Sequence, residues 1–119
     1  MDAANPGKTA ELLACKHLQA QGLSLLERNF HSRHGEIDLI MNHRDCVIFI
    51  EVRYRRESRF GSGAESVDRR KQAKILACAA YYLQRHPQAA CCPCRFDVVA
   101  VSGAAGQPDI LWIQDAFQA

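Results

Sequence analysis

The chain lacks the features that mark membrane, secreted or disordered proteins. Its 119 residues contain no apolar run near the ~20 residues of a membrane-spanning helix. The opening residues include an acid at position 2 and no basic segment followed by an apolar one, unlike a secretory signal. Apolar residues make up 48% and charged residues 24%, which is typical of globular chains. We therefore expect one domain over residues 1–119, no membrane partner and a cytoplasmic location.

A second pair of closely spaced metal ligands is also missing. Residues 91–94 read CCPC, so Cys91 and Cys94 form one CxxC pair. A structural zinc site needs a second such pair to complete its tetrahedron, and the sequence offers neither another CxxC nor an HxxxH. Thiols in the cytoplasm are reduced by default. We therefore expect the six cysteines to be free thiols.

The net charge is only +2, but the charges are distributed unevenly along the chain. Residues 53–74 carry eight basic and three acidic side chains, whereas the other residues carry seven basic and ten acidic ones. Such a cluster indicates a polyanionic partner such as nucleic acid. A solvated loop and helix face would have the same composition, so the charge pattern alone leaves both interpretations open.

Hydrophobic periodicity and turn residues predict two helices and five strands. The three strands after the first helix, and the helix and strand that follow them, predict an α/β fold with a mixed central sheet flanked by helices. Residues 88–94 are expected to form a loop. The helices are expected at about 8–21 and 67–86, and the strands at about 24–31, 35–41, 46–55, 95–102 and 110–113.

The inward stripes of the two predicted helices differ in one respect. In the first helix, Glu11 occupies the same stripe as Ala14 and Leu18. An acid in that position is costly unless it is paired or bound to a cation, so Glu11 is a candidate ligand. The second helix is expected to bury a mainly apolar stripe made of Gln72, Ile75, Leu76, Ala79 and Leu83.

Acids also recur in the second and third predicted strands. Because strand side chains alternate with period two, Asp38 is expected to share a face with Glu36 and Ile40. A hairpin centred between residues 44 and 45 places Asp38 directly opposite Glu51. A shift by one residue leaves the two acids diagonal, ~7–8 Å apart. Both registers predict that Asp38 and Glu51 lie on one face.

Two facing carboxylates repel each other unless a cation lies between them. Carboxylate and water oxygens suit Mg²⁺ or Mn²⁺, and such an ion can activate water against a phosphodiester. Arg53, one pleat beyond Glu51, is placed to stabilise developing negative charge. The alternative is a surface hairpin in which Glu36 and Glu51 only pair with Arg33, Arg53 or Arg55.

The acids and their spacing resemble a known signature. Asp38, twelve intervening residues and then Glu51-Val-Arg53 are similar to the bipartite motif of the PD-(D/E)XK nuclease superfamily, which has a restriction-endonuclease-like fold. The resemblance implies an αβββαβ core. The nearer resemblance is to the small YraN family of predicted endonuclease-like proteins, through GEIDLI, VIFIEVRYRR, FGSGAESV, KQAKILACAAYYL and RFDVVAV.

The resemblance also implies residue roles. Asp38 and Glu51 would be the catalytic, metal-binding acids, and Glu11 would be an additional acid from the first helix. The backbone carbonyl of Val52 would add a ligand. Gln72 matches a position where some relatives place a glutamine that contacts phosphate or metal.

Arg53 is the main departure from the superfamily motif, which has lysine there. A guanidinium stays protonated and cannot act as a general base, although it can hold a phosphate. The resemblance implies a Mg²⁺- or Mn²⁺-dependent endonuclease for structured or branched DNA, and Arg53 favours a non-catalytic nucleic-acid-binding protein instead. An interaction module with ion-paired acids is a third possibility. The residues expected to contact DNA are Arg55, Arg56, Arg59, Arg69, Arg70, Lys71, Gln72 and Lys74.

The remaining candidates are assigned to structure. Asp97 could support the site from a neighbouring strand or pair with Arg95 or Arg33, and we favour the pairing. Trp112 and Phe117 are expected to pack in the core, because a base-stacking platform usually needs several clustered aromatic side chains. A homodimer would suit cleavage of two strands, although no residue requires one.

Overall fold

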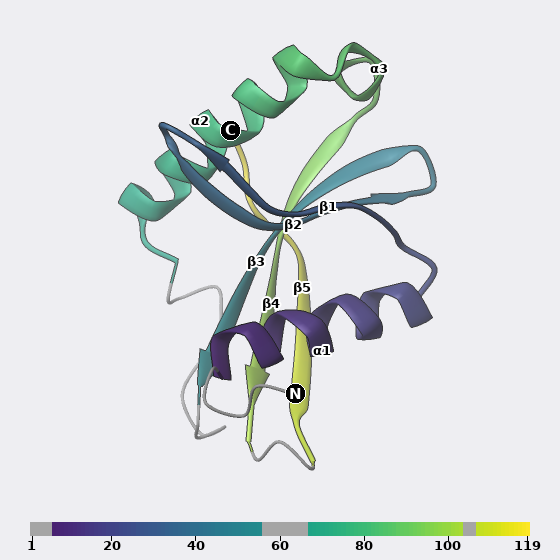
Figure 1. Cartoon of the computed structure of the whole chain (residues 1–119), viewed down its shortest axis with the longest axis vertical. Helices are drawn as coiled ribbons and strands as arrows, with labels where there is room; N and C mark the ends of the chain where they lie inside the picture. Colours follow the sequence, from purple (N-terminus) through teal and green to yellow (C-terminus); the bar gives the residue numbers. More distant parts are fainter. Residues whose placement is uncertain (1–5, 56–66, 104–106) are drawn as a thin grey trace.

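A computed structural model of the chain describes residues 6–55, 67–103 and 107–119 (Figure 1). The expected α/β fold with its αβββαβ order is confirmed. The short helix α3 replaces part of the expected loop, because Pro87 fixes its own φ at the first helical position. The elements are α1 (Pro6–Ala20), β1 (Ser24–Ser32), β2 (Gly35–His43), β3 (Cys46–Arg55), α2 (Arg69–Arg85), α3 (Pro87–Ala90), β4 (Cys94–Ser102) and β5 (Asp109–Phe117).

The five strands form one mixed sheet in the order β1-β2-β3-β4-β5. β3 and β4 are parallel, and the other neighbouring pairs are antiparallel. Parallel neighbours need a long crossover connection, and α2 lies within the connection from β3 to β4. β5 is longer than expected, because it pairs with β4 from Ser102↔Asp109 to Phe96↔Phe117.

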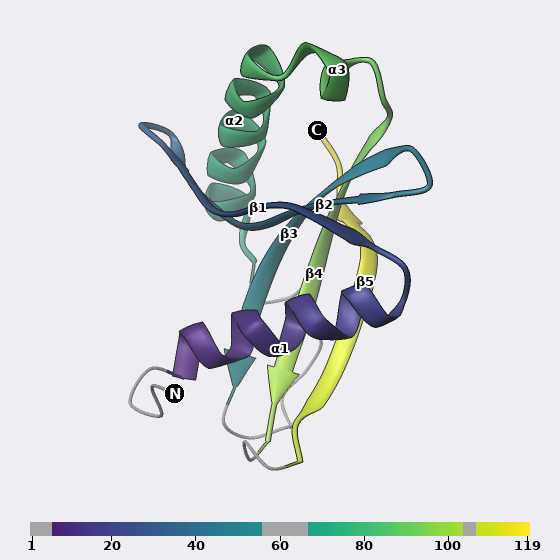
Figure 2. The same ribbon diagram turned by 45° about the vertical axis from the view of Figure 1, so that its right-hand side comes forward.

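Two hydrophobic cores lie on opposite faces of the sheet. α1 crosses β3, β4 and β5 on one face, whereas α2 lies beside the β1–β2 hairpin (Figure 2). The α1 core includes Ala14, Leu18, Leu39, Met41, Ile48, Ile50, Val99 and Val101. The α2 core includes Phe30, Ile37, Ile40, Val47, Phe49, Ile75, Cys78, Ala79, Tyr82, Phe96 and Val98.

The buried stripe of α2 differs from the expected one. Cys78 and Tyr82 are buried, whereas Gln72, Leu76 and Leu83 are only half-buried. The helix is rotated so that Tyr82 packs edge-on against Phe30 of β1, with 5.1 Å between ring centroids. The sequence pattern of α2 could not show this, because the β1–β2 hairpin decides which side of the helix is covered.

A glycine and a capping side chain set two of the helix ends in the described segments. Gly22 has φ 99° and closes α1, and the N–H of Leu23 donates to the carbonyl of Leu18 at 3.1 Å. Asp68 caps α2 by accepting the N–H of Lys71 at 2.8 Å. None of the described helices is long and apolar enough to cross a membrane. The six cysteines are free thiols.

Candidate functional site

β2 and β3 separate at the point where two candidate acids lie. Their pairing runs from His43↔Cys46 to Leu39↔Ile50 and ends there. Beyond this pair, the described part of β2 continues beside β1, and that of β3 continues beside β4. Asp38 and Glu51 are the first residues past the last pair on either side of this fork. The register is the predicted one that centres the hairpin between residues 44 and 45.

Side chains of β2 do not alternate strictly at the fork. Ile37 and Ile40 pack in the same α2 core although they are three residues apart, while Leu39 packs in the α1 core. The neighbouring strand is also irregular, because Asn29 of β1 has φ 52° and the β1–β2 register shifts between Leu25 and Glu27. The period-two alternation on which the prediction for Asp38 and Ile40 rests is therefore not kept at the fork.

Asp38 and Glu51 instead come together through the opening between the two strands. Glu51 follows Val47 and Phe49 in the regular alternation of β3 and lies on the α2 side of the sheet. Asp38 lies next to Glu11 of α1. Asp38 therefore lies at the fork with Glu11 of α1 and Glu51 of β3 as neighbours.

Asp38 is a buried carboxylate with little compensation. It is 8% exposed, and its Oδ2 accepts the N–H of Val52 at 2.8 Å. Burial and the neighbouring Glu51 carboxylate raise the pKa of Asp38 to about 8, with a further contribution from Glu11, although the Val52 N–H opposes the shift. Without a bound cation, Asp38 is therefore mainly protonated at pH 7.

Two further acids approach Asp38 from the α1 side. Carboxylate oxygens of Glu11, Glu36 and Asp38 all lie within 4.8 Å of one another. Burial and Glu36 raise the pKa of Glu11, while a hydrogen bond with Asn29 lowers it. Glu36 also lies 3.3 Å from the Nδ1 of His31. The sequence pattern left the role of Glu36 open between this site and an arginine pair, and the structure places it in the acidic cluster.

Glu51 faces basic side chains on the α2 side. It is 5% exposed, and its Oε2 lies 3.4 Å from Nη1 of Arg53 and 3.2 Å from Nζ of Lys71. The cap formed by Asp68 fixes the first turn of α2 and so helps to place Lys71. Lys71 was expected only to contact DNA. Its approach to Glu51 has no signal in the sequence, because it depends on how α2 docks against β3.

The other predicted contacts are placed as follows. Gln72 donates its side-chain N–H to the carbonyl of Val67 at 2.9 Å. Its amide is therefore already hydrogen-bonded at the start of α2. Val52 contacts Asp38 through its N–H, and its carbonyl as a metal ligand stays a prediction. Arg56 and Arg59 lie outside the described residues. Of the residues predicted to contact DNA, Arg55, Arg69, Arg70, Lys71 and Lys74 are exposed on β3 and α2.

The acidic cluster fits a hard divalent cation. Its donors are carboxylate oxygens, which Mg²⁺ and Mn²⁺ prefer, and the spacing of Glu11, Glu36 and Asp38 lets one ion contact all three. A cation would also favour the ionised form of Asp38 and remove the repulsion that raises its pKa. Glu51 interacts with Asp38 but is not among the three acids that share this spacing.

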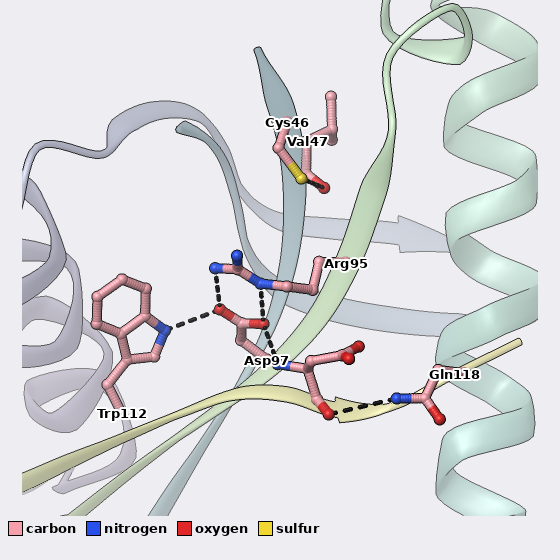
Figure 3. A network of polar contacts seen from close by, with 7 residues as sticks. Cys46, Val47, Arg95, Asp97, Trp112 and Gln118 are labelled. Carbon is pink, nitrogen blue, oxygen red and sulfur yellow. Dashed lines mark hydrogen bonds and ion pairs between the residues drawn. The ribbon is translucent and has the colours of Figure 1, made fainter. Parts of the chain in front are cut away.

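Asp97 of β4 is a third buried carboxylate, but protein donors surround it (Figure 3). Arg95 donates from Nε to Oδ1 at 2.8 Å and from Nη2 to Oδ2 at 2.9 Å. The indole N–H of Trp112 reaches Oδ2 at 2.8 Å, and the backbone N–H of Asp115 reaches Oδ1 at 2.9 Å. The prediction that Asp97 pairs with Arg95 is confirmed, and Trp112 adds a donor that the packing prediction missed.

The fold and its acids define a mixed α/β protein with a candidate cation site at a fork in the sheet. The chain belongs to the uncharacterised protein family UPF0102, whose family model matches residues 10–101. That match spans Glu11, Glu36, Asp38, Glu51 and Lys71.

Several UPF0102 proteins are similar to the chain over most of its length. A relative from Nitrosococcus oceani is 53% identical over 112 residues, which cover 94% of this chain and 90% of the relative. A relative from Stutzerimonas stutzeri is 48% identical over 117 residues and 98% of each chain. One from Saccharophagus degradans is 50% identical over 111 residues, 93% of this chain and 91% of the relative. These names state a family and no activity.

Proposed function

We propose that this protein is a Mg²⁺- or Mn²⁺-dependent endonuclease that hydrolyses phosphodiester bonds in structured or branched DNA. The observation that carries the proposal is the environment of Asp38. This buried carboxylate has Glu11, Glu36 and Glu51 as neighbours and a pKa raised to about 8. A fold gains nothing from such an arrangement unless a cation binds there. The resemblance to PD-(D/E)XK nucleases supports the same conclusion.

Each acid has a distinct place in the proposed mechanism. Asp38 and Glu51 would hold the ion from the two strands of the fork, and Glu11 and Glu36 would complete the oxygen set. A bound ion would lower the pKa of a water ligand and polarise the phosphodiester. Burial of Asp38 and Glu51 limits competing water around the carboxylates, so the interaction with a cation is strong.

Arg53 and Lys71 together take the roles that the motif lysine has in the superfamily. Both lie against the Oε2 of Glu51. The Arg53 guanidinium can hold the scissile phosphate but cannot release a proton at working pH. Lys71 supplies an amine, which can orient the attacking water or assist proton transfer. The absence of lysine at position 53 is therefore compatible with hydrolysis.

The start of α2 supports a polyanionic partner. Its first residues are Arg69, Arg70 and Lys71, and the first turn contains no acid. Cations at the N-terminus of a helix oppose the helix dipole by about 0.3–1 kcal/mol each. Phosphates that approach this turn would interact favourably both with these cations and with the helix dipole. Binding to DNA is then expected to weaken steeply with salt, by about 0.9 in the logarithmic slope per neutralised phosphate.

A second function remains in competition because of Arg53. Its guanidinium bonds the same Glu51 oxygen that a metal would need. If this pair persists with DNA bound, the protein would bind nucleic acid through its basic surface without cutting it. The two functions predict the same salt dependence of binding and differ in cleavage.

The deciding experiment is cleavage of junction, flap, single-stranded and duplex DNA with Mg²⁺ or Mn²⁺. We expect Asp38→Asn and Glu51→Gln to reduce cleavage by about 10³-fold or more, because each removes a charge that holds the ion. Asp45→Asn is the matched control. Asp45 is exposed in the β2–β3 turn with φ 64°, a conformation that asparagine also tolerates.

Each outcome of this experiment selects one function. Cleavage that persists in Asp38→Asn at the wild-type rate comes from a contaminant and rejects the nuclease. Salt-sensitive binding by all variants without cleavage by the wild type selects the non-catalytic nucleic-acid-binding protein. If neither binding nor cleavage is seen, the acids serve another partner, as in an interaction module.

A further inference from the structure

A groove lies between the β1–β2 turn and α2, outside the acidic cluster. Its volume is about 410 Å³, which is within the ~300–1,000 Å³ of typical small-ligand sites. One wall is the turn and the other is the helix. The lining residues are Arg33, His34, Ala77, Ala80, Tyr81 and Gln84.

Contacts between the turn and α2 fix the groove in place. The N–H of His34 donates to Oγ of Ser32 at 3.1 Å, and that hydroxyl donates to Sγ of Cys78 at 3.3 Å. Cys78 in turn donates to the carbonyl of Gly35 at 3.5 Å. A Cβ on Gly35 would lie 3.4 Å from Cβ of Lys74, so the turn sits close against the helix. The groove is therefore a built feature of the packing.

The walls combine aromatic rings with basic groups. Rings of His34 and Tyr81 are 6.4 Å apart between centroids and inclined by 60°. Phe30 supports Tyr81 from behind at 6.1 Å. Arg85 lies over the Tyr81 ring at 5.4 Å and donates to its hydroxyl at 3.2 Å. Arg33 is exposed at the rim.

The base of the groove is formed by small side chains. Ala77 and Ala80 are three residues apart on α2 and therefore lie on one side of the helix. Two alanines leave room for a flat group to approach Tyr81, where a larger side chain would fill the space. An aromatic wall, a small-residue base and a basic rim together match a nucleotide, which has a flat base and an anionic phosphate.

We propose that this groove binds an unpaired base of single-stranded DNA that flanks the bond to be cut. The proposal rests on the proposed function and extends it to the class of substrate. The base stacks on Tyr81 or His34, while Arg33 and Arg85 contact the adjoining phosphates. A base within duplex DNA is already stacked and cannot enter, so the groove selects junctions, flaps or other substrates with unpaired bases.

The position of the groove along α2 sets its distance from the acids. Lys71 reaches Glu51, Lys74 lies against Gly35, and Tyr81 lines the groove. At 1.5 Å per residue, Lys71 and Tyr81 are about 15 Å apart along the helix. Where the nucleotides between the two sites remain paired, at 3.4 Å per nucleotide of duplex, this corresponds to about four nucleotides. The base in the groove is therefore expected about four nucleotides from the scissile phosphate.

The test fills the groove without changing any charge. Ala80 is exposed on α2, so Ala80→Leu occupies the space and keeps a good helix former. Ala20→Leu, exposed at the end of α1, is the matched control. Affinities for a labelled single strand, for the matching duplex and for free mononucleotides are measured in EDTA by fluorescence anisotropy. Cleavage is measured separately with metal.

We expect Ala80→Leu to weaken single-strand binding about ten-fold, because one stacked base contributes about 1–3 kcal/mol. Duplex binding and the salt dependence are expected to stay unchanged, and Ala20→Leu should behave as the wild type. An abasic site about four nucleotides from the cut should weaken the wild type and leave Ala80→Leu unaffected.

Other results overturn the proposal. Equal loss of single-strand and duplex affinity in Ala80→Leu indicates a general effect on α2, and no loss shows that the groove is not used. Mononucleotide binding as tight as oligonucleotide binding indicates a small-molecule site instead. Groove-dependent binding without cleavage rejects only the nuclease, whereas cleavage that is indifferent to Ala80→Leu and to the abasic position rejects only the groove.

Discussion

Asp38 and Asp97 are buried aspartates in the same sheet with opposite surroundings. Asp97 accepts hydrogen bonds from Arg95, Trp112 and the backbone of Asp115. Asp38 accepts one from Val52 and otherwise faces carboxylates. Hydrogen-bond donors therefore surround Asp97, whereas burial and the neighbouring carboxylates raise the pKa of Asp38.

This difference separates a structural acid from a candidate ligand. The donors around Asp97 join β4 to β5 and bond both of its carboxylate oxygens (Figure 3). Among the described residues, the acids around Asp38 do not compensate its charge, so a cation is the partner that would satisfy it. Burial by itself does not distinguish the two residues, since both are largely withdrawn from solvent.

We expect substitution of Asp97, whose carboxylate oxygens are both hydrogen-bonded, to have the largest effect on stability. We expect Asp97→Asn to lower the free energy of unfolding by about 3–5 kcal/mol, because Arg95 loses its buried counter-charge and the new amide brings donors toward donors. Urea unfolding followed by circular dichroism measures the change. Asp109→Asn, exposed on β5, should change stability by less than about 0.5 kcal/mol. A small effect at Asp97 would show that its network does not hold the β4–β5 edge.

In metal-free protein, we expect Asp38→Asn to raise the free energy of unfolding at high pH, whereas Asp97→Asn lowers it. Because its pKa is raised to about 8, the folded chain binds a proton between pH 4 and 8 that the unfolded chain has released. Stability therefore falls as pH rises through this range, by up to about 1.4 kcal/mol per pH unit. Asp38→Asn should lose this fall and exceed the wild type at pH 8.

Unfolding in EDTA across pH 5–9 measures this effect, and Asp45→Asn should keep the wild-type slope. Added Mg²⁺ should flatten the slope of the wild type, because the ion replaces the proton at Asp38. A wild-type slope identical to that of Asp38→Asn would contradict the assignment of Asp38 as a buried acid with a raised pKa.

The contacts of Glu51 predict unequal roles for two lysines of α2. Lys71 reaches Glu51, whereas Lys74 lies against the β1–β2 turn. We expect Lys71→Met to slow cleavage about 10–100-fold, which corresponds to about 1.4–2.7 kcal/mol in the barrier. Lys74→Met should affect mainly the salt dependence of DNA binding. Equal losses of cleavage in single-turnover kinetics would reduce Lys71 to a phosphate contact.

Of the acids in the cluster, we expect Glu36 to contribute least to cation binding, because it is the most exposed of them. Glu36→Gln is expected to weaken Mn²⁺ binding about ten-fold, or about 1.4 kcal/mol. Isothermal titration calorimetry measures this affinity. Glu27→Gln on β1, which lies outside the acidic group, is the control. Wild-type affinity in Glu36→Gln would limit the ligands to Glu11, Asp38 and Glu51.

The element boundaries follow closely from the sequence because their signals are local. Gly22 ends α1, Pro87 ends α2, and the turn at residues 44 and 45 sets the register of β2 and β3. These features depend on backbone conformation within a few residues. The positions of Asp38, Glu51 and Glu11 in β2, β3 and α1 were therefore predictable, and so was the pairing of Asp97 with Arg95.

Other features of the site depend on contacts between distant elements. The alternation of β2 predicts Asp38 and Ile40 on one face, but the alternation is not kept at the fork, where Ile40 packs with Ile37. The approach of Lys71 to Glu51 and the placement of Glu36 beside Glu11 require α2 and α1 to dock. Periodicity carries no information about where a sheet divides or how a helix rotates on it.

The order of helices and strands, the hairpin register and the presence of acids where apolar residues are expected follow from local backbone preference and periodicity, which the amino-acid order sets directly. The fork at Asp38, the approach of Glu11, Glu36 and Glu51 to it, and the hydrogen bonds around Asp97 arise only when the elements pack together. Those outcomes depend on the packing of α1, α2 and the β1–β2 hairpin around the fork, where distant groups compete for the same buried space.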